Sequence, residues 1–370
     1  MPDDATTGGV TPELPFLRLV PDDASAVRTA IERVLQRGWF VLGPEVEAFE
    51  MEFAAAAGTS RSVGVASGTD ALALALRGLG VGPGDEVITT PLTASFTALA
   101  IVLAGAKPVF TDIDPERLTL SPSAVGEAVN SKTAALVPVH LYGQAADMPA
   151  LMAVAARHNL AIVEDCCQAH LATCGGQPVG TFGQAAAFSF YPTKNLGALG
   201  DGGAVCTNDD RLADRVASLR DGGQSGRDVH TETGINSRLD ELQAAILRAR
   251  LPQLPQRTER RRALAAAYRR GLIDAPVTVP LQVDAGHVYH LFPVRSKRRD
   301  ALRAHLRSLG IGTLVHYPTP VARQPAFSRF TPAECPVAET ACDELLSLPL
   351  YPELSDESVD RVCGALERFA

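Results

Sequence analysis

Lysine is the rarest charged residue in this sequence of 370 residues, so chemistry that requires a primary amine has few candidates. The only lysines are Lys107, Lys132, Lys194 and Lys297. The first precedes a predicted strand, the second lies in a polar loop, and the last lies in the solvated basic run RSKRR. Lys194 instead lies in the apolar, glycine-rich stretch 187–203, where loss of hydration lowers the pKa of an amine. Such an amine is a nucleophile that forms Schiff bases.

A second group of polar residues, Ser67-Gly68-Thr69-Asp70, lies between a predicted strand and a predicted helix. The first backbone N–H groups of a helix have no partner within the helix, so they can bind a phosphate together with a hydroxyl group. Ser, Thr and Asp are also the residues that cap helices. Considered alone, this segment is better interpreted as a helix cap than as a phosphate site.

Polar residues also follow the apolar segment 160–163, which predicts a buried strand. They include Glu164, Asp165, Gln168 and His170. In an open parallel sheet, ligands bind at the carboxyl ends of the strands. We expect Glu164 to be exposed at the strand end. Asp165 lies so close to the buried run that its carboxylate requires a cationic or proton-donating partner.

A phosphate site, an acid at a strand end and a buried lysine 29 residues later together match what pyridoxal 5'-phosphate (PLP) requires. The phosphate of this cofactor must be held, its pyridinium nitrogen kept protonated by a carboxylate, and its aldehyde bound by a lysine. Motifs of other classes are absent: there is no GxxxxGK(S/T), GxSxG or HExxH, and no GxGxxG after a strand. We expect no metal site, because Cys166, Cys167 and Cys174 have no fourth ligand at zinc-site spacing.

The elements that must position these residues alternate along the chain. From about residue 60 to 207, short apolar runs alternate with amphipathic segments, which predicts an α/β fold with a mostly parallel sheet between helices. The pattern changes at 251–255, LPQLP. We therefore predict a large PLP-binding domain with an N-terminal arm over 1–250 and a smaller α+β domain over 251–370. In the smaller domain we expect strands at 287–295 and 312–318, and helices near 299–309, 338–346 and 356–369.

Charge and hydropathy narrow the range of partners. The net charge of -8, from 34 basic and 42 acidic residues, argues against nucleic-acid binding, which depends on neutralising phosphates. The uncharged run 87–106 contains too many Thr, Ser and Pro residues for a membrane helix, so we expect no membrane association. The acidic beginning of the sequence does not resemble a secretory signal, and we expect a cytoplasmic protein with small-molecule substrates.

The chain resembles the sugar-nucleotide aminotransferases of the DegT/StrS family, which are PLP-dependent enzymes of fold type I. The resemblance covers nearly the whole length. It depends on a series of motifs in order: GWFVLGP at 38–44, SGTDAL at 67–72, PVHLYG at 138–143, ED at 164–165, SFYPTKN at 189–195 and GINSRLDE at 234–241. The resemblance implies the fold-type-I sheet and an aminotransferase activity.

It also implies roles for individual residues. Lys194 would be the Schiff-base lysine and the general acid and base, and Asp165 the partner of the pyridine nitrogen. Gln168 and His170 would flank the cofactor ring, with Gln168 near its phenolic oxygen.

The cofactor phosphate would be held by Gly68, Thr69 and Ser189, and by Asn236 of a neighbouring subunit. The resemblance therefore implies a homodimer with shared active sites.

The sequence departs from many of these relatives at one position. They place an aromatic residue over the cofactor ring in the loop after the strand DEVITT, where this chain has Ala94. Phe96 lies two residues further on, so either it makes this contact or the face stays open. Some family members also have Ala there, so this departure bears on substrate preference and not on activity.

The resemblance implies that L-glutamate or L-glutamine donates an amino group through the cofactor to a nucleotide-linked keto-deoxy sugar, in ping-pong fashion. Such a reaction belongs to amino-sugar or antibiotic biosynthesis. Candidate sugar contacts are Arg227, His230, His316 and Tyr317. Loop and packing roles explain these four residues equally well.

Alternatives remain. An aminotransferase for a keto-cyclitol would carry the same motifs. A sugar dehydratase is disfavoured, because related dehydratases replace the Schiff-base lysine with His, and this chain has Lys194. A PLP-binding regulatory protein without turnover would need a partner-binding or DNA-binding module, and the sequence has no spare segment for one.

Overall fold

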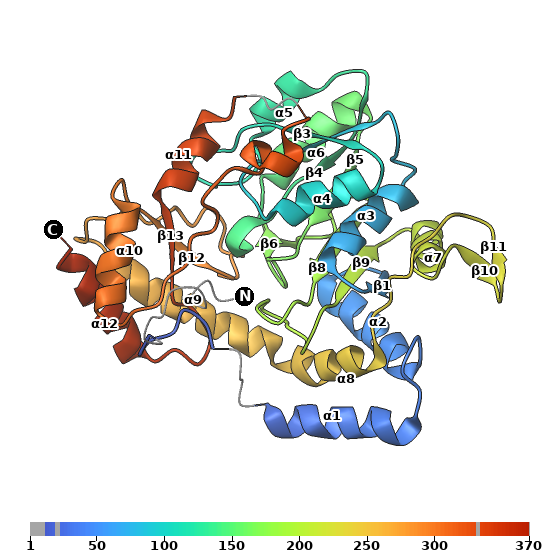
Figure 1. Ribbon diagram of the computed structural model, residues 1–370, viewed down its shortest axis with the longest axis horizontal. Helices are drawn as coiled ribbons and strands as arrows, with labels where there is room; N and C mark the ends of the chain where they lie inside the picture. Colours follow the sequence, from blue (N-terminus) through green and yellow to red (C-terminus); the bar gives the residue numbers. More distant parts are fainter. Residues whose placement is uncertain (1–11, 19–22, 331–333, 370) are drawn as a thin grey trace.

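The computed structural model of the protein describes residues 12–18, 23–330 and 334–369. Its centre is a seven-stranded sheet (Figure 1). The strands of this sheet are β1 (Arg61–Val65), β2 (Glu86–Thr89), β3 (Lys107–Phe110), β4 (Thr133–Val137), β5 (Ala161–Asp165), β8 (Ala185–Ser189) and β9 (Gly203–Thr207). They are arranged in the order β1-β9-β8-β5-β4-β2-β3, and only β9 is antiparallel to its neighbours. The sheet confirms the predicted α/β fold.

Helices cover both faces of this sheet. The α-helices within the described residues are α1 (Ala24–Arg37), α2 (Pro44–Ala57), α3 (Gly68–Gly78), α4 (Ser95–Leu103), α5 (Pro122–Ala128), α6 (Met148–His158), α7 (Asp210–Leu219), α8 (Glu241–Arg250), α9 (Leu254–Gly271), α10 (Arg299–Ser308), α11 (Pro336–Glu344) and α12 (Asp356–Glu367). Alternate residues of each strand point to opposite faces. In β8, Ala185 and Ala187 therefore join the core with α3, α4 and α7, whereas Ala186 and Phe188 join the core with α2, α6 and α8.

A buried carboxylate connects two helices that are far apart in the sequence. Glu241, the first residue of α8, accepts hydrogen bonds from the backbone nitrogens of Gly43, Glu45 and Val46 at 2.8–3.0 Å. These N–H groups lie at the start of α2, where the helix supplies no partners and its dipole favours a negative charge. Helix α1 packs along α8 on the same side of the molecule (Figure 1). Glu241 thereby anchors the N-terminal helices to the sheet domain.

The C-terminal part of the chain has its own hydrophobic cluster, formed by residues of α9, α10, α12 and a short antiparallel pair. The pair consists of β12 (Phe292–Arg295) and β13 (Leu345–Leu348). The predicted strand at 287–295 is therefore shorter than expected. The segment 312–318 forms no strand and makes only a single bridge, from Leu314 to Ser347. The division of the chain near residue 250 remains a prediction.

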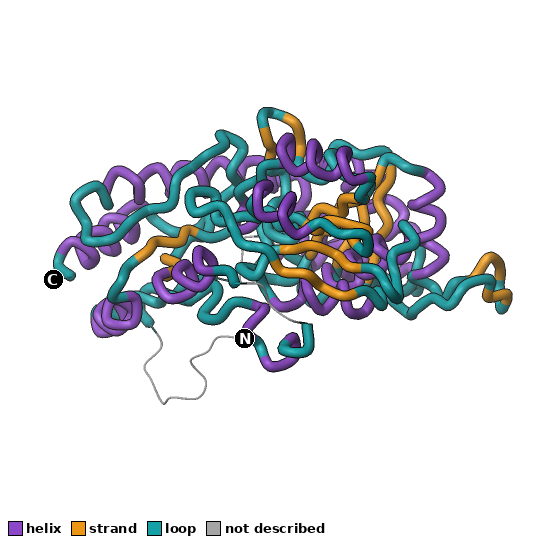
Figure 2. Tube along the Cα trace, turned by 90° about the horizontal axis from the view of Figure 1, so that it is seen from above, coloured by secondary structure: helices purple, strands orange, loops and turns teal. Residues whose placement is uncertain are grey.

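The remaining elements are short. They are the strand pair β6 (Thr173–Cys174) and β7 (Gln177–Pro178), the pair β10 (Gln224–Gly226) and β11 (Val229–His230), and the 3-10 turns η2 (Leu141–Gly143), η3 (Leu251–Gln253), η4 (Val321–Arg323) and η5 (Pro325–Phe327). The hairpin β10–β11 extends away from the body of the molecule (Figures 1 and 2). No helix within the described ranges is both long and apolar enough to cross a membrane.

Candidate active site

Asp165 is the last residue of β5, at the carboxyl end of a central strand of the sheet. Its side chain is buried, with 4% of the residue exposed. Thr97 of α4 donates a hydrogen bond from Oγ1 to Asp165 Oδ2 at 2.8 Å, and the backbone nitrogen of Cys167 donates to Oδ1 at 3.1 Å. The expected proton-donating partner of this carboxylate is therefore a threonine hydroxyl, supported by a backbone amide.

Lys194 lies in the loop that follows β8, the strand next to β5. Its side chain is half-buried, and burial lowers the pKa of its amine, as the apolar surroundings in the sequence predict. The nearby groups of Cys167 and Asp165 act in the opposite direction and favour the charged form. The loss of hydration outweighs their attraction, so Lys194 is more easily deprotonated than an ordinary lysine.

A cavity of about 230 Å³ adjoins the loop that carries Lys194. Its lining includes Arg250 and Arg257, which form ion pairs with Asp23 at 2.7 Å and Glu353 at 2.5 Å. The cavity leaves room for a small polar molecule next to this loop.

Gln168 connects three segments at the same edge of the sheet. Its Oε1 accepts a hydrogen bond from the backbone nitrogen of Tyr142 at 2.8 Å, and its Nε2 donates to the hydroxyl of Tyr317 at 3.1 Å. Burial raises the pKa of Tyr317 to about 12, so its hydroxyl stays protonated. His316 is held by a hydrogen bond between Nδ1 and Ser347 Oγ at 2.9 Å. The structure thus brings the candidates His316 and Tyr317 into the same site as Gln168.

His170 is enclosed by aromatic rings, with its ring centre 5.5 Å from that of Phe188 and 5.9 Å from that of Phe190. Neither ring nitrogen has a hydrogen-bond partner among the described residues. Burial, assisted by the positive charge of Lys194, lowers the pKa of His170 to about 3. A buried polar group without a hydrogen-bond partner costs free energy. A bound cofactor could supply the partner that this neutral imidazole lacks.

The start of α3 lies against the end of β8. Ser67 caps the helix by accepting a hydrogen bond from the backbone nitrogen of Asp70 at 3.1 Å, which supports the helix-cap interpretation for this residue. Within the described chain, the backbone nitrogens of Gly68 and Thr69 have no partner. A Cβ at Gly68 would lie 2.7 Å from Ser189 Cβ, so the close approach requires glycine. Two free N–H groups beside a serine hydroxyl form a cradle that fits a phosphate.

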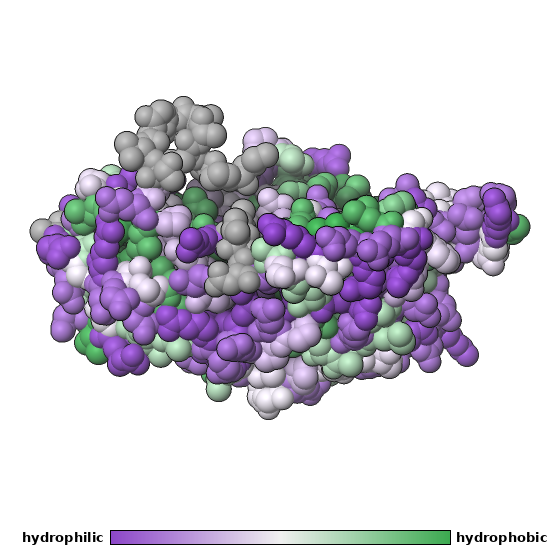
Figure 3. Space-filling model, turned by 90° about the horizontal axis from the view of Figure 1, so that it is seen from below, coloured by the Kyte–Doolittle hydropathy of each residue, from purple (hydrophilic) through white to green (hydrophobic). Residues whose placement is uncertain are grey.

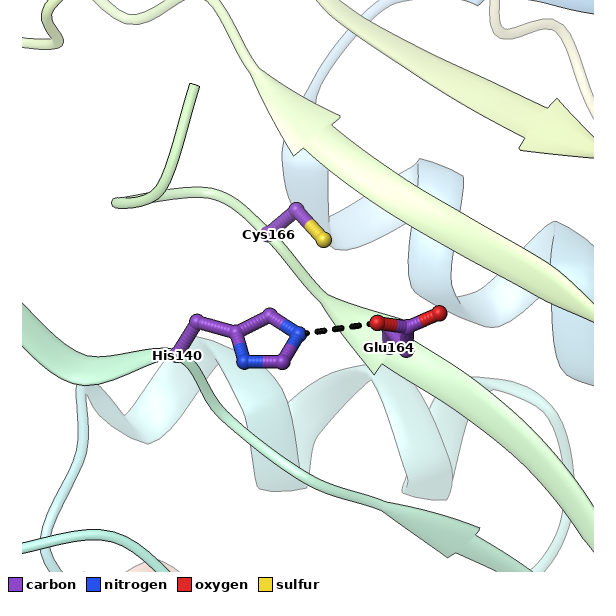
Figure 4. A group of neighbouring side chains, drawn as sticks. All are labelled: His140, Glu164 and Cys166. Atoms are coloured by element: carbon purple, nitrogen blue, oxygen red, sulfur yellow. Dashed lines mark hydrogen bonds and ion pairs between the residues drawn. The ribbon is translucent and has the colours of Figure 1, made fainter. Parts of the chain in front are cut away.

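The exposed position expected for Glu164 is wrong, because its side chain is completely buried. Glu164 Oε2 lies 3.0 Å from His140 Nε2 (Figure 4). Its two oxygens also accept hydrogen bonds from the backbone nitrogens of residues 180, 182 and 183 at 2.8–2.9 Å. The carboxylate and Asp165 point to opposite faces of β5. The backbone groups that bind the carboxylate lie in a turn 16 to 19 residues later, so the residues next to Glu164 in the sequence do not predict its burial.

The same group contains Cys166, and its donor atoms lie close enough to bind a metal ion. However, His140 Nδ1 accepts a hydrogen bond from the backbone nitrogen of Ala146 at 3.0 Å, so Nε2 carries the proton that points to Glu164. Burial also raises the pKa of the Cys166 thiol well above its usual value. Since these donor atoms are already protonated or hydrogen-bonded, we interpret the group as a structural clamp.

Three of the sequence-derived candidates lie away from Lys194 within one chain. Arg227 and His230 belong to the projecting hairpin β10–β11, and the Arg227 side chain is 97% exposed. Asn236 is exposed and pairs with Asp221 in an isolated bridge. Within the described chain, these three residues form no hydrogen bond with Lys194, Asp165 or Gln168.

The loop before α4 contains the departure noted in the sequence. Ala94 precedes the first residue of this helix, and Phe96 is 64% exposed. Thr97, on the next position, points to Asp165. Within one chain, Phe96 is therefore not enclosed by the site.

Sequence patterns missed several residues of the site: Thr97, Tyr142, Asn195 and His290. Asn195 and Thr97 lie directly after residues that the sequence singles out, Lys194 and Phe96, and Tyr142 lies within the motif at 138–143, but no local pattern gives any of the three a role. His290 lies in the predicted strand 287–295, where nothing in the apolar pattern marks it as a site residue.

The chemical groups gathered at this site match those that bind PLP. It combines an amine with a lowered pKa, a hydrogen-bonded carboxylate, a neutral histidine without a partner and a glycine-lined cradle of free N–H groups. All of these lie at the carboxyl edge of the central strands, where open parallel sheets bind ligands.

Comparison with known proteins supports this interpretation. Residues 21–367 match the model of the DegT/DnrJ/EryC1/StrS aminotransferase family. The chain is 49% identical over 370 residues to a dTDP-3-amino-3,4,6-trideoxy-alpha-D-glucose transaminase of Streptomyces venezuelae, with 97% of both chains covered.

Solved structures agree. The crystal structure of S. venezuelae DesV in complex with a ketimine intermediate superimposes with a TM-score of 0.94 at 48% identity and covers 97% of this chain and 99% of that one. The structure of NtdA from Bacillus subtilis with bound cofactor PMP has a TM-score of 0.90 at 30% identity, covering 97% and 85%.

Proposed function

We propose, from the premise that this chain belongs to the DegT/DnrJ/EryC1/StrS aminotransferase family, that it transfers an amino group from L-glutamate or L-glutamine to a nucleotide-linked keto-deoxy sugar. The family is PLP-dependent, and the activity of the chain is that of a sugar aminotransferase. The name of the relative that is 49% identical supports a dTDP-linked sugar as the acceptor and amino-sugar biosynthesis as the pathway. The name of a second relative, 48% identical, refers to erythromycin biosynthesis and supports an antibiotic pathway.

One observation carries this proposal: Lys194, an amine with a lowered pKa, lies beside the buried carboxylate of Asp165 at the carboxyl edge of the sheet. When bound, PLP stores the amino group between the two half-reactions. Asp165 would keep a proton on the ring nitrogen, because its carboxylate is held by the Thr97 hydroxyl and the Cys167 backbone nitrogen and forms no ion pair with a basic side chain among the described residues. Lys194 would then move a proton to and from the substrate carbon.

The other site residues would hold and orient the cofactor. Gly68, Thr69 and Ser189 would bind its phosphate, since the two free N–H groups and the hydroxyl lie together. Gln168 and His170 would flank its ring.

The acceptor sugar would contact His316 and Tyr317, which lie in the same hydrogen-bonded network as Gln168. Burial lowers the pKa of His316 to about 4, so its imidazole is neutral and can accept a hydrogen bond from a sugar hydroxyl.

A homodimer completes the proposal. Asn236 would reach the phosphate of the neighbouring site, and Arg227 and His230 on the projecting hairpin would contact the neighbour's substrate. Large apolar side chains are exposed at several places, and Figure 3 shows such patches among polar ones on one face. The exposed large apolar side chains include Trp39, Phe40, Phe96 and Leu103. Exposed apolar surface of this kind supports association with a second copy.

The first test is spectroscopic. Purified protein with PLP should show an absorbance band of the lysine-bound cofactor that changes when L-glutamate is added. Lys194→Ala should abolish that band and the amino-acid response, whereas the control Lys297→Ala should keep both, because Lys297 is exposed in the turn before α10. If Lys194→Ala behaves as the unchanged protein does, Lys194 is not the reactive amine.

The acceptor is tested with the aminated form of the enzyme. Keto sugars linked to dTDP or UDP, and free keto-cyclitols, are supplied in turn, and the return of the original absorbance is measured. We expect the nucleotide-linked sugars to react. Reaction with free cyclitols alone would replace the nucleotide-sugar proposal, and a cofactor band that never responds to amino acids would favour a regulatory protein.

A further inference from the structure

The residue after Lys194 forms the side-chain hydrogen bonds that hold this part of the loop. Asn195 Nδ2 donates to the backbone oxygen of Val288 at 3.2 Å, and Asn195 Oδ1 lies 3.2 Å from His290 Nδ1. Because the Val288 oxygen can only accept, the amide nitrogen must face it and the amide oxygen must face His290. His290 Nδ1 therefore carries the hydrogen and donates a hydrogen bond to Asn195 Oδ1.

His290 is itself fixed by a buried arginine. Arg261 of α9 donates from Nη1 to the backbone oxygens of Tyr289 at 3.1 Å, His290 at 3.4 Å and Leu350 at 2.9 Å. Burial lowers the pKa of Arg261 to about 10, and no acidic side chain forms an ion pair with it within the described ranges. The three backbone carbonyl groups thus stabilise its positive charge. These hydrogen bonds hold the segment around His290 against α9.

The rest of the Lys194 loop is fastened elsewhere. Arg250 of α8 donates from Nη1 to the backbone oxygens of Gly197 and Ala198. The backbone nitrogen of Lys194 donates to the oxygen of Tyr191 at 2.8 Å. Among the described residues from 193 to 196, Asn195 is the only one whose side chain forms a hydrogen bond. The position of the chain next to Lys194 therefore depends on the segment 288–290.

We infer that His290 is a positioning residue for Lys194, which acts through Asn195 to hold the reactive amine in its low-hydration position. The inference rests on the proposed function in one respect, that Lys194 is the reactive amine. It assigns His290 no contact with substrate or cofactor.

The charge state of His290 suits this role. Burial, together with the positive charges of Lys194 and Arg261, lowers its pKa well below the usual value, so the imidazole is neutral. The titratable groups around Lys194 are Asp165, Cys167, His170, His290 and His316. A neutral hydrogen-bond donor at position 290 holds Asn195 without placing a second positive charge beside the amine.

The scarcity of lysine makes a direct test possible. Full-length protein without PLP is labelled with a trace of acetic anhydride at a series of pH values, and the labelling of each lysine is measured by mass spectrometry. Lys132 and Lys297 serve as internal references. In the unchanged protein the labelling midpoint of Lys194 should lie below those of the references, because burial lowers its pKa.

His290→Ala removes the donor and admits water, so the labelling midpoint of Lys194 should rise by about one pH unit, a tenfold change in the deprotonated fraction. His290→Asn should retain a midpoint near that of the unchanged protein, because the amide nitrogen branches from the same carbon as Nδ1. Asn195→Ala breaks the same bond from its other end and should shift the midpoint as His290→Ala does.

His287→Ala is the matched control. His287 is as buried as His290, at 6% against 7% exposed, and lies in the same segment. Its Nδ1 accepts a hydrogen bond from the backbone nitrogen of Tyr289, and among the described residues its side chain forms no hydrogen bond with residues 193–196. It should leave the Lys194 midpoint unchanged. Equal shifts in His287→Ala and His290→Ala, or no shift in His290→Ala and Asn195→Ala, would overturn the inference.

The PLP-loaded enzyme provides a second readout. With His290→Ala, kcat should fall by about tenfold to a hundredfold while KM for L-glutamate changes by less than about threefold, since misplacing a reacting group mainly affects the chemical step. Folding is checked by the free energy of unfolding. If Lys194→Ala retained activity, the proposed function would fail, whereas the labelling result would still report whether His290 positions this amine.

Discussion

At the scale of single residues, His170 shows how a cofactor site differs from an ordinary core. Its imidazole is packed among the rings of Phe53, Phe188 and Phe190, yet both nitrogens lack partners in the described chain. The pKa of His170 is lowered to about 3 from the usual 6.5. Its neutral form therefore contributes stability that is complete above pH 6.5 and is lost as the pH falls toward 3.

This predicts a specific pH dependence for His170→Leu. Between pH 7 and pH 5 the unfolded chain gains a proton at His170 that the folded protein does not accept, so the unchanged protein should lose about 2 kcal/mol more of its free energy of unfolding than the variant. Urea denaturation at both pH values measures the difference. His158→Leu, at the exposed end of α6, should lose as much as the unchanged protein. Equal losses of the free energy of unfolding in all three proteins would contradict the lowered pKa of His170.

At the scale of elements, Glu164 joins β5 to the turn at 180–183 and to His140. Glu164→Gln replaces one acceptor oxygen by a donor group that faces buried N–H groups. We expect the free energy of unfolding to fall by about 2–4 kcal/mol. Because Asp165 is the next residue of the strand, PLP affinity should fall as well.

The matched control is Glu241→Gln. Glu241 is also fully buried and accepts three backbone hydrogen bonds, but it belongs to α8 and its partners are the amides at the start of α2. We expect a similar loss of stability with unchanged PLP affinity, measured by fluorescence titration. A Glu164→Gln protein that keeps both stability and affinity would show that the clamp contributes little.

At the scale of the whole molecule, the proposed dimer predicts complementation between two inactive chains. Lys194→Ala removes the amine, and Asn236→Asp would place a carboxylate next to the neighbour's phosphate. In a mixed dimer, one site combines the intact Lys194 of one chain with the intact Asn236 of the other. With random pairing, about a quarter of the full activity should return. Mixed dimers isolated by two affinity tags but without activity would contradict a shared site.

Local patterns predict the parts of this protein that depend on neighbours in the sequence. The apolar runs predict most of the strands of the central sheet, and the glycine-rich setting marks Lys194 before its surroundings are known. Contacts over long separations have no such signal. Thr97 reaches Asp165 over 68 positions, and His290 reaches Asn195 over 95. The exposed position expected for Glu164 is wrong for the same reason, because its partners lie in another turn.

The cap that Glu241 forms on α2 has a consequence for how the chain is made. Its hydrogen bonds span 195 to 198 residues. During synthesis from the N-terminus, the amides at the start of α2 remain without this partner until residue 241 has left the ribosome. The N-terminal helices therefore reach their final packing only after about two-thirds of the chain exists, which places a contact of very high sequence separation late in folding.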